Sequence, residues 1–228
     1  ASLAGVRAAE TLRSGGFTGS ITVIGAERHM PYDRPPLSKK FLSGEWEADR
    51  IALRKPEDLV TLNIEWKLGA AAVALDVEKQ IISLEDGSIV QYDGLIITTG
   101  GVARLLPHQP PLAGIHTLRT IDDAIALRDE IQTGSRVVVI GAGFIGLEAA
   151  ATAVQRGAHA TVLEGLEAPL IRGLGRDMGS AIALVHEKNG VSIRCGVQVA
   201  AIQGDSRVSG VLLSSGELID GACRRCTV

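Results

Sequence analysis

The sequence predicts an α/β fold that contains two similar units in tandem, and three observations lead to this prediction. A buried strand runs into a glycine-rich turn and a helix at 136–150, RVVVIGAGFIGLEAA. The N-terminal stretch 1–27 follows the second half of the same plan. Two longer segments, 63–101 and 189–228, then repeat one pattern of short alternating strands. Repetition of this kind indicates two copies of one supersecondary plan within the chain.

The composition is that of an ordinary globular protein. Hydrophobic residues make up 46% of the 228 residues and charged residues 21%, and this length suffices to bury a sizeable core. The formal net charge of −3 argues against a nucleic-acid partner, which requires a basic face. No apolar run approaches the roughly 20 residues of a membrane helix, and no secretory leader is evident. Three cysteines do not make a disulfide framework, which favours the cytoplasm.

The stretch 136–150 predicts a loop that binds the pyrophosphate of a dinucleotide. Four apolar residues, 137–140, form a buried strand. Gly141, Gly143 and Gly146 then supply the G-x-G-x-x-G spacing of a Rossmann turn. A helix is expected over 144–156, with Gly157 in a C-cap position.

A second strand is expected at 159–164, and it closes on Glu164. This carboxylate lies 23 residues beyond Gly141, about where a Rossmann unit places the acid that binds an adenine ribose 2′-OH. A carboxylate there repels a 2′-phosphate, so NAD is favoured over NADP. Because strand, helix, second strand and acid are in register, we predict a dinucleotide site. The alternative is a glycine turn in some other α/β protein.

Residues 1–27 predict the second half of a like unit. A helix ends at Gly15-Gly16, and a strand, ITVIG, leads to Glu27. Gly5 takes the place of the third glycine, and Ser2 stands where the second usually is. The chain is therefore expected to begin inside a phosphate loop, without the first strand of the unit. A surface helix and strand of no special use is the alternative. One helical face is formed by Leu3, Val6, Ala9 and Leu12.

The two longer segments match position by position until their ends. There, LIITTG at 95–100 predicts a buried strand, whereas the second copy has ACRRCT at 222–227. Two arginines in a central strand would be costly to bury, so this tail is expected to be truncated or read from a shifted frame. The prolines of RLLPHQPPLAG, 104–114, predict the boundary between domains 1–110 and 111–228. Matched positions are Asn63 with Asn189, Gly69 with Gly196, Gly87 with Gly216, and Asp93 with Asp220.

The motif PYDRPPLSKKF at 31–41 lies between the two units, and with it the chain resembles a known family. It is similar to the FAD-dependent ferredoxin reductases of oxygenase and cytochrome P450 systems, within the pyridine nucleotide-disulfide oxidoreductase superfamily. Apoptosis-inducing factor shares much of the pattern. The resemblance implies two tandem Rossmann-like domains, an FAD domain (1–110, lacking its first strand) with an inserted NAD domain (111–228, with an aberrant last strand). The matching stretches are PYDRPPLSK, LIITTG, HTLRTIDDA and VVVIGAGFIGLEAAA.

The resemblance implies hydride transfer from NADH to FAD, then transfer of single electrons to a [2Fe-2S] ferredoxin or a rubredoxin. A flavin suits this task because it accepts two electrons together and releases them singly. In some relatives the acid of the FAD site stands at the position of Ala26. The implied FAD contacts are Ala4, Gly5, Glu27, Arg34, Lys39, Ala72, Thr99, Gly100, Arg104 and Arg119. The implied NADH contacts are Gly141, Gly143, Phe144, Ile145, Gly146, Glu164 and Arg172.

Lys39 and Glu148 are the catalytic pair that the resemblance implies. The lysine after PPLS lies by the flavin in this family and pairs with the glutamate of IGLE. A cation there stabilises negative charge on the reduced flavin, more strongly in a partly desolvated site than in water. Glu148 is expected in the first turn of its helix. The alternative for Glu148 is a favourable interaction with the helix dipole, worth ~0.5 kcal/mol. The alternative for Lys39 is that it is simply one of two adjacent solvated lysines.

Two other functions remain open. A disulfide reductase or single-cysteine NADH oxidase of the same superfamily needs a redox cysteine beside the flavin, but residues 28–60 contain none and Cys195 is alone. Cys223-x-x-Cys226 has a redox spacing but falls in the discordant tail. The other alternative is a non-catalytic fragment that binds NAD weakly. No metal site is predicted, because the five histidines lack ligand spacing and are each expected at the surface or with a satisfied partner.

Overall fold

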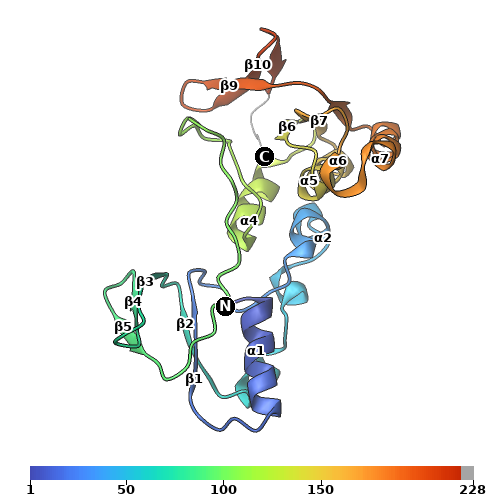
Figure 1. Ribbon diagram of the computed structural model, residues 1–228. Helices are drawn as coiled ribbons and strands as arrows, with labels where there is room; N and C mark the ends of the chain where they lie inside the picture. The colour runs from blue at the N-terminus through green and yellow to red at the C-terminus, as the bar shows by residue number, and fades with distance from the viewer. Residues whose placement is uncertain (222–228) are drawn as a thin grey trace. The chain divides into compact units, whose positions relative to one another are not determined.

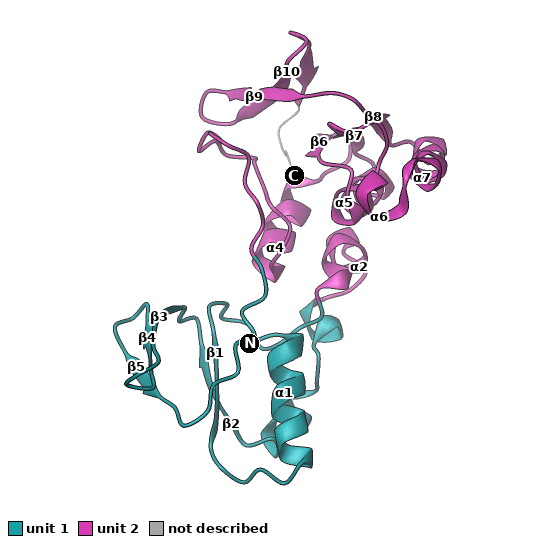
Figure 2. Cartoon of the chain, in the orientation of Figure 1, with its two compact units in different colours: residues 1–33, 48–101 teal, residues 34–47, 102–228 magenta. Residues whose placement is uncertain are grey.

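The computed structural model describes residues 1–221, and its contacts divide the chain into two compact units (Figure 2). Unit 1 comprises residues 1–33 and 48–101. Unit 2 comprises residues 34–47 and the described residues from 102 onward. The PPLSK motif thus belongs to unit 2, a grouping that sequence reasoning did not anticipate. The cofactor domains 1–110 and 111–228 stay a prediction, and the discordant tail from 222 lies outside the described residues.

Unit 1 contains one long helix, a parallel pair of strands and an antiparallel sheet (Figure 1). Its elements are α1 (Leu3–Ser14), β1 (Ile21–Gly25), η2 (Ala48–Ile51), α3 (Pro56–Thr61), β2 (Ile64–Leu68), β3 (Ala72–Asp76), β4 (Ile81–Leu84) and β5 (Ile89–Gln91). β1 pairs with β2 in parallel, and the antiparallel strands follow the order β3-β4-β5. Of the predicted helical face, Val6 and Ala9 of α1 are buried and Leu12 is half-buried, but Leu3 is exposed.

Unit 2 contains a parallel sheet with the strand order β6-β7-β8 and an antiparallel sheet with the order β11-β10-β9. Val138 and Leu163 of the first sheet share one apolar core with Val211 and Leu213 of the second. The α/β fold class is therefore confirmed. The elements are η1 (Pro35–Ser38), α2 (Lys40–Ser43), α4 (Ile121–Glu130), β6 (Arg136–Ile140), α5 (Phe144–Gln155), β7 (His159–Leu163), α6 (Ile171–Leu174), α7 (Arg176–Lys188), β8 (Ser192–Arg194), β9 (Val199–Gly204), β10 (Val208–Leu213) and β11 (Leu218–Asp220).

The internal repeat is confirmed by topology. The parallel pair β1-β2 corresponds to β7-β8, and each pair is followed by three antiparallel strands. Equivalent hydrogen bonds follow the second parallel strand in each copy. The Gly69 N–H donates to the Glu27 carbonyl at 3.0 Å, and the Gly196 N–H donates to the Leu166 carbonyl at 2.8 Å. The same plan is thus folded twice, once in each unit.

Helices α1 and α5 begin in the same way. Ser2 and Gly143 are the respective N-caps, both in extended conformation. Gly5 and Gly146 each follow three residues later, so Gly5 occupies the position of the third glycine. A Cβ at Gly5 would lie 3.3 Å from Thr98 Oγ1, so α1 packs closely against the segment that contains Thr98.

The prediction of a buried strand at 95–100 is wrong. The segment forms no strand, and Leu95, Ile96 and Ile97 are 37%, 57% and 66% exposed. A strand requires a neighbour that supplies the hydrogen-bond ladder. Within residues 1–221, β1 pairs only with β2, and no strand pairs with this segment. An apolar run predicts burial but does not provide the partner that buries it.

His116 departs from the expectation that each histidine is exposed or satisfied. Its Nε2 is buried and has no hydrogen-bond partner in the described part of the chain. Burial lowers the pKa of His116 below its usual value, although the nearby carboxylates of Glu130 and Asp123 raise it in part. Arg207, which forms an ion pair with Glu130 at 3.0 Å, lowers the pKa further. Burial inside unit 2 therefore favours the neutral imidazole.

This burial predicts that unit 2 loses stability as the pH falls below the ordinary histidine value. Because the folded pKa of His116 lies below the unfolded one, the unfolded chain binds the proton more readily, and the stabilisation is lost as the pH falls toward the folded pKa. His186, whose pKa is also lowered by burial, acts in the same direction. Thermal unfolding at about pH 7.5 and about pH 5.5 measures the loss.

His116→Leu is expected to reduce this pH dependence, because it removes one of the two titrating groups. His159→Gln is the matched control, since His159 is exposed. The explanation is wrong if His116→Leu keeps the full pH dependence of the parent chain.

Candidate functional site

The turn between β6 and α5 has the backbone that a pyrophosphate-binding loop needs. Gly141 adopts φ +106°, a conformation that residues with side chains rarely adopt. A Cβ at Gly146 would lie 2.3 Å from the Gly141 carbonyl oxygen, so α5 can pack on the turn only with glycine there. Nothing lies within 4 Å of a Cβ built at Gly143, which leaves that backbone open to a ligand. Glycine is therefore required at these three positions for three different structural reasons.

The N-terminus of α5 is suited to an anion. The helix starts at Phe144, has no side-chain cap and carries no acidic residue in its first turn. Its first N–H groups and their partial positive charge are thus available to a phosphate. The placement of Glu148 in the first turn is wrong, because Gly143 is the N-cap and Glu148 falls in the second turn. The helix dipole therefore explains this glutamate less well than the prediction assumed.

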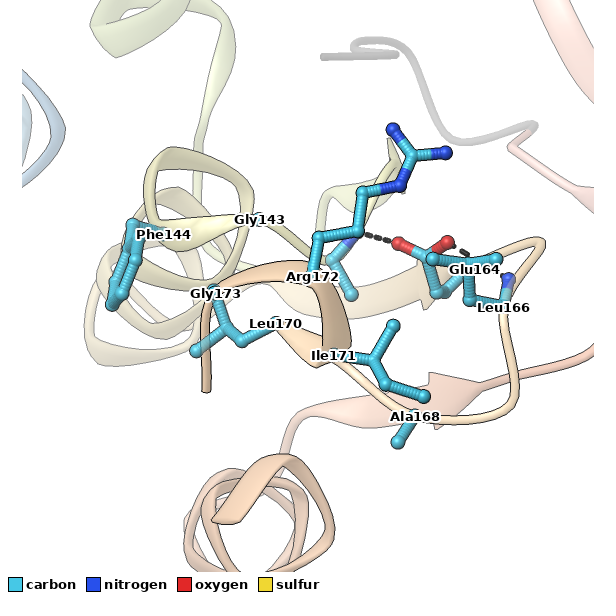
Figure 3. Close-up of a pocket in the computed structure, with 10 residues that line it drawn as sticks. Gly143, Phe144, Glu164, Leu166, Ala168, Leu170, Ile171, Arg172 and Gly173 are labelled. Carbon is cyan, nitrogen blue, oxygen red and sulfur yellow. Dashed lines mark hydrogen bonds between the residues drawn. The ribbon is translucent and has the colours of Figure 1, made fainter. Parts of the chain in front are cut away.

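A pocket of about 350 Å³ lies beside this turn, within unit 2 (Figure 3). It is bounded by the glycine turn, the end of β7 and α6. Four predicted NADH contacts line it together, namely Gly143, Phe144, Glu164 and Arg172. The other three predicted contacts belong to the adjoining turn and α5 and do not line the pocket: Gly141, Ile145 and Gly146.

The Glu164 carboxylate is fixed at the pocket by two backbone N–H groups (Figure 3). Oε2 accepts a hydrogen bond from Ala142 N at 2.8 Å, and Oε1 accepts one from Leu166 N at 2.9 Å. Each oxygen keeps lone-pair capacity for a further donor. Hydroxyl groups can therefore donate to a preorganised acceptor, whereas a phosphate would meet a fixed negative charge. Arg172 is exposed, and its guanidinium makes no hydrogen bond or ion pair within residues 1–221.

The wall of the pocket includes residues that sequence reasoning missed. Leu170 adopts φ +54°, a strained conformation for a residue with a branched side chain. Its N–H donates to the Ala142 carbonyl at 3.1 Å, which ties the wall to the glycine turn. A Cβ at Gly179 of α7 would lie 2.1 Å from the Pro169 carbonyl oxygen, so that glycine lets the helix approach the wall. No local sequence pattern signals these contacts.

Lys39 and Glu148 form an ion pair in unit 2. Lys39 Nζ lies 2.8 Å from Glu148 Oε2 and also donates to the Pro35 carbonyl at 3.0 Å. The side chains are 47% and 31% exposed, so the pair contributes at most about 1 kcal/mol to stability. The pairing that the resemblance implied is thus present, while its catalytic role stays a prediction.

Two other predicted FAD contacts of unit 2 also lie together. Arg34 Nη1 donates to the Arg119 carbonyl at 2.5 Å. Arg119 directly precedes the capping box of α4, in which Thr120 and Asp123 bond each other's backbone N–H groups. Asp123 Oδ2 also accepts from Arg119 N at 2.9 Å, which fixes the Arg119 backbone. Arg104 is separate, exposed and outside regular structure.

The predicted FAD contacts of unit 1 lie around the carboxyl ends of β1 and β2 and the N-terminus of α1. Glu27 follows β1 and accepts a hydrogen bond from the Tyr32 hydroxyl. By backbone register, however, the counterpart of Glu164 is Gly25, because Ala70 N bonds Gly25 O as Val197 N bonds Glu164 O. Gly5 is buried at the start of α1. The remaining contacts are exposed, namely Ala4, Ala72, Thr99 and Gly100.

The described residues hold little that suits thiol or metal chemistry. Cys195 is the only cysteine within 1–221, and burial raises the pKa of its thiol, as do the charges of Glu164 and Glu187. A reactive thiolate is therefore disfavoured. The predicted Cys223-x-x-Cys226 pair lies outside the described residues. In residues 1–221, no three histidine, cysteine or acidic side chains gather as metal ligands, and no helix is long and apolar enough to cross a membrane.

Comparison with known proteins places this geometry in a family. The family model for pyridine nucleotide-disulphide oxidoreductases matches residues 1–225. The chain belongs to this family. Its Rossmann-type α/β architecture is accordingly that of FAD- and NAD-dependent oxidoreductases.

Among its relatives, a rhodocoxin reductase from Rhodococcus erythropolis is 40% identical over 218 residues, which cover 95% of this chain and 51% of the relative. The ferredoxin–NAD(+) reductase subunit of a benzene 1,2-dioxygenase system from Pseudomonas putida is 36% identical over 215 residues, covering 94% and 52%. The crystal structure of a covalent putidaredoxin reductase–putidaredoxin complex matches with a TM-score of 0.93 at 33% identity, covering 99% and 55%. The resemblance to ferredoxin reductases is confirmed, and the chain spans about half the length of the curated relatives it matches.

Proposed function

We propose that the protein is an FAD-dependent NADH:ferredoxin reductase that passes electrons to a ferredoxin or a rubredoxin serving an oxygenase or a cytochrome P450. One observation carries the proposal. Helix α5 begins at a pyrophosphate-type glycine turn and, in its next turn, holds Lys39 through Glu148. A dinucleotide site and a fixed cation are thus built on one element. The names of the relatives, which include reductases of dioxygenase and putidaredoxin systems, support the same reading.

The residues of unit 2 fit NADH. A Cβ at Gly146 would meet the Gly141 carbonyl, whereas the space around Gly143 is open, so the backbone itself would approach the pyrophosphate at the N-terminus of α5. Glu164 would accept hydrogen bonds from the hydroxyls of the adenine ribose. Arg172 lines the same pocket and would hold a phosphate or the adenine end of the cofactor. NAD is preferred over NADP because the fixed carboxylate repels a 2′-phosphate.

The residues predicted to contact FAD fit a flavin dinucleotide in part. When bound, FAD accepts two electrons together and releases them singly. The start of α1 repeats that of α5, so Ala4 and Gly5 would face the FAD pyrophosphate. Lys39 would hold a positive charge near the flavin, with its amine oriented by Glu148. The further contacts we propose are Glu27, Ala72, Thr99 and Gly100 of unit 1, and Arg34, Arg104 and Arg119 of unit 2.

We place this reaction in the cytoplasm, because three cysteines are too few for a disulfide framework.

The visible spectrum and extractable flavin of the purified chain test the proposal. We expect about one FAD per chain, bleached rapidly by NADH and slowly by NADPH. A colourless chain that still binds NADH would contradict the flavin part of the proposal for this polypeptide. Lys39→Gln is expected to slow bleaching by about tenfold or more, because it removes the cation near the flavin. Lys40→Gln is the matched control, since Lys40 is adjacent, 55% exposed and outside the pair with Glu148.

A further inference from the structure

Three side chains spaced four residues apart, two on α5 and one at its C-cap, hold the segment 34–47. Glu148 Oε2 accepts hydrogen bonds from Ser38 Oγ at 2.5 Å and Lys39 Nζ at 2.8 Å. Thr152 Oγ1 donates to the Ser38 carbonyl at 2.8 Å. Arg156 follows on the same helical face. All these residues belong to unit 2, so the contacts lie within one compact body.

Arg156 connects the C-terminal ends of three helices, α2, α4 and α5. Its Nη1 donates to the carbonyls of Leu42 and Ser43, at 3.1 Å and 3.0 Å, where α2 ends. Its Nη2 donates to the carbonyls of Arg128 and Ile131, at 3.0 Å and 3.1 Å, where α4 ends. Carbonyls at helix ends lack partners within their own helices, and a cation there is also favoured by the helix dipole. Arg156 therefore fixes α2, which directly follows Lys39, against α4 and α5.

Apolar packing alone would not place Lys39. Leu37, Phe41 and Leu42 are at most 3% exposed, so burial of their side chains attaches the segment to unit 2. Burial is non-directional, however, whereas a hydrogen bond specifies a distance and an angle. The bond between Thr152 and Ser38 is fully enclosed, since each residue is only 4% exposed. It sets the position of the residue next to Lys39 and is shielded from solvent.

We propose that Thr152 and Arg156 are positioning residues that set the place of the Lys39 amine. Helix α5 then carries the glycine turn at its start and the anchor of Lys39 along its length, so one rigid element spaces the two. The relevance of this spacing to electron transfer rests on the proposed function. The positioning itself does not, because it concerns only contacts within unit 2.

Competitive labelling of lysine amines by an acylating reagent, read by mass spectrometry, tests the proposal. Lys39 is held by Glu148 and the Pro35 carbonyl. Lys40 lies 3.7 Å from Glu45 and 5.3 Å from the centre of the Trp46 ring, makes no contact with Thr152 or Arg156, and serves as the internal reference. Thr152→Val removes the donor at nearly constant volume and is expected to raise the Lys39:Lys40 labelling ratio by about threefold or more. Thr152→Ser keeps the donor and is expected to retain the parent ratio.

Arg156→Gln provides a second, independent variant and is expected to raise the ratio in the same way. A thermal melt of each variant shows whether it is folded, and labelling is compared only between folded chains. If Thr152→Val or Arg156→Gln folds and keeps the parent ratio, the positioning role is overturned. Equal increases in Thr152→Val and Thr152→Ser would also overturn it, because the hydroxyl would then be irrelevant.

This test is independent of the proposed function, because labelling requires neither flavin nor NADH. A chain without flavin would overturn the reductase proposal and leave the labelling result standing. Where the chain does hold flavin, Thr152→Val is expected to lower kcat with little change in the KM for NADH, and Thr152→Ser is expected to restore kcat. A purely structural defect would not follow this split and this rescue.

Discussion

Replacing Gly146 with alanine is expected to abolish measurable NADH binding and to lower the melting temperature. The new Cβ would lie 2.3 Å from the Gly141 carbonyl oxygen, which belongs to backbone and cannot rotate away. Overpacking of this kind costs about 1–3 kcal/mol, which corresponds to a fall of about 2–12 °C for a chain of this size. The glycine turn must also shift, so the N-terminus of α5 no longer presents its N–H groups to the pyrophosphate.

Fluorescence titration with NADH and a thermal melt measure the two effects, and two other glycines separate them. Gly143→Ala has free space around the new Cβ, so it should keep the melting temperature and weaken NADH binding by obstructing the approach of the phosphates. Gly94→Ala also has free space and lies outside the predicted cofactor contacts, so it should change neither quantity. A Gly146→Ala chain with normal NADH affinity would show that the turn does not bind the nucleotide.

Removing the charge of Glu164 is expected to change the choice between the two nicotinamide cofactors. Glu164→Gln keeps the shape of the side chain but loses the negative charge and one of the two acceptor oxygens that face Ala142 and Leu166. Hydrogen bonds to a charged group are worth about 1.5–3 kcal/mol, so NADH affinity should fall by about tenfold or more. The repulsion of a 2′-phosphate disappears at the same time, so the preference for NADH over NADPH should shrink further.

Parallel titrations with NADH and NADPH give the ratio of the two dissociation constants. Glu167→Gln is the matched control, because this substitution makes the same charge change nearby. Glu167 pairs with Arg176 and does not line the pocket. Its ratio should equal that of the parent chain. An unchanged ratio in Glu164→Gln would mean that this carboxylate does not face the ribose.

Local patterns predicted helices α1 and α5 and the glycine turn before α5, because the causes of these features are local. Gly141 takes a backbone conformation that few other residues adopt, and the apolar spacing around Val6 marks the buried face of α1. The two copies of the fold could likewise be matched at Gly69 with Gly196 and at Gly87 with Gly216. The match of Asp93 with Asp220 is wrong, because the strand register makes Gln91 the counterpart of Asp220. The strand predicted at 95–100 failed because a strand depends on a neighbour that local sequence does not provide.

The candidate site was predictable only in part, for the same reason. Gly143 and Glu164 were found because they lie in one continuous motif, and Lys39 was found by resemblance. Leu170 and Gly179 were missed, because their importance lies in close contacts between segments. Thr152 and Arg156 follow Glu148 at helical spacing, a pattern that indicates a shared face but not what the face contacts.

The sequence by itself therefore determined the repeated α/β plan, the glycine turn before α5 and the acid at the end of β7. The glycine turn follows from the conformations allowed to glycine, and the repeated plan follows from the hydrophobic period of its strands and helices. The acid follows from its spacing after the glycine turn. None of the three requires knowledge of a distant partner. Only the tertiary structure decided that segment 34–47 packs on α5. The pairing of Lys39 with Glu148, across 109 positions of sequence, was implied by resemblance and not by any local pattern. Contacts over that separation form through packing of the whole unit, because burial brings distant segments together and hydrogen bonds then set their register.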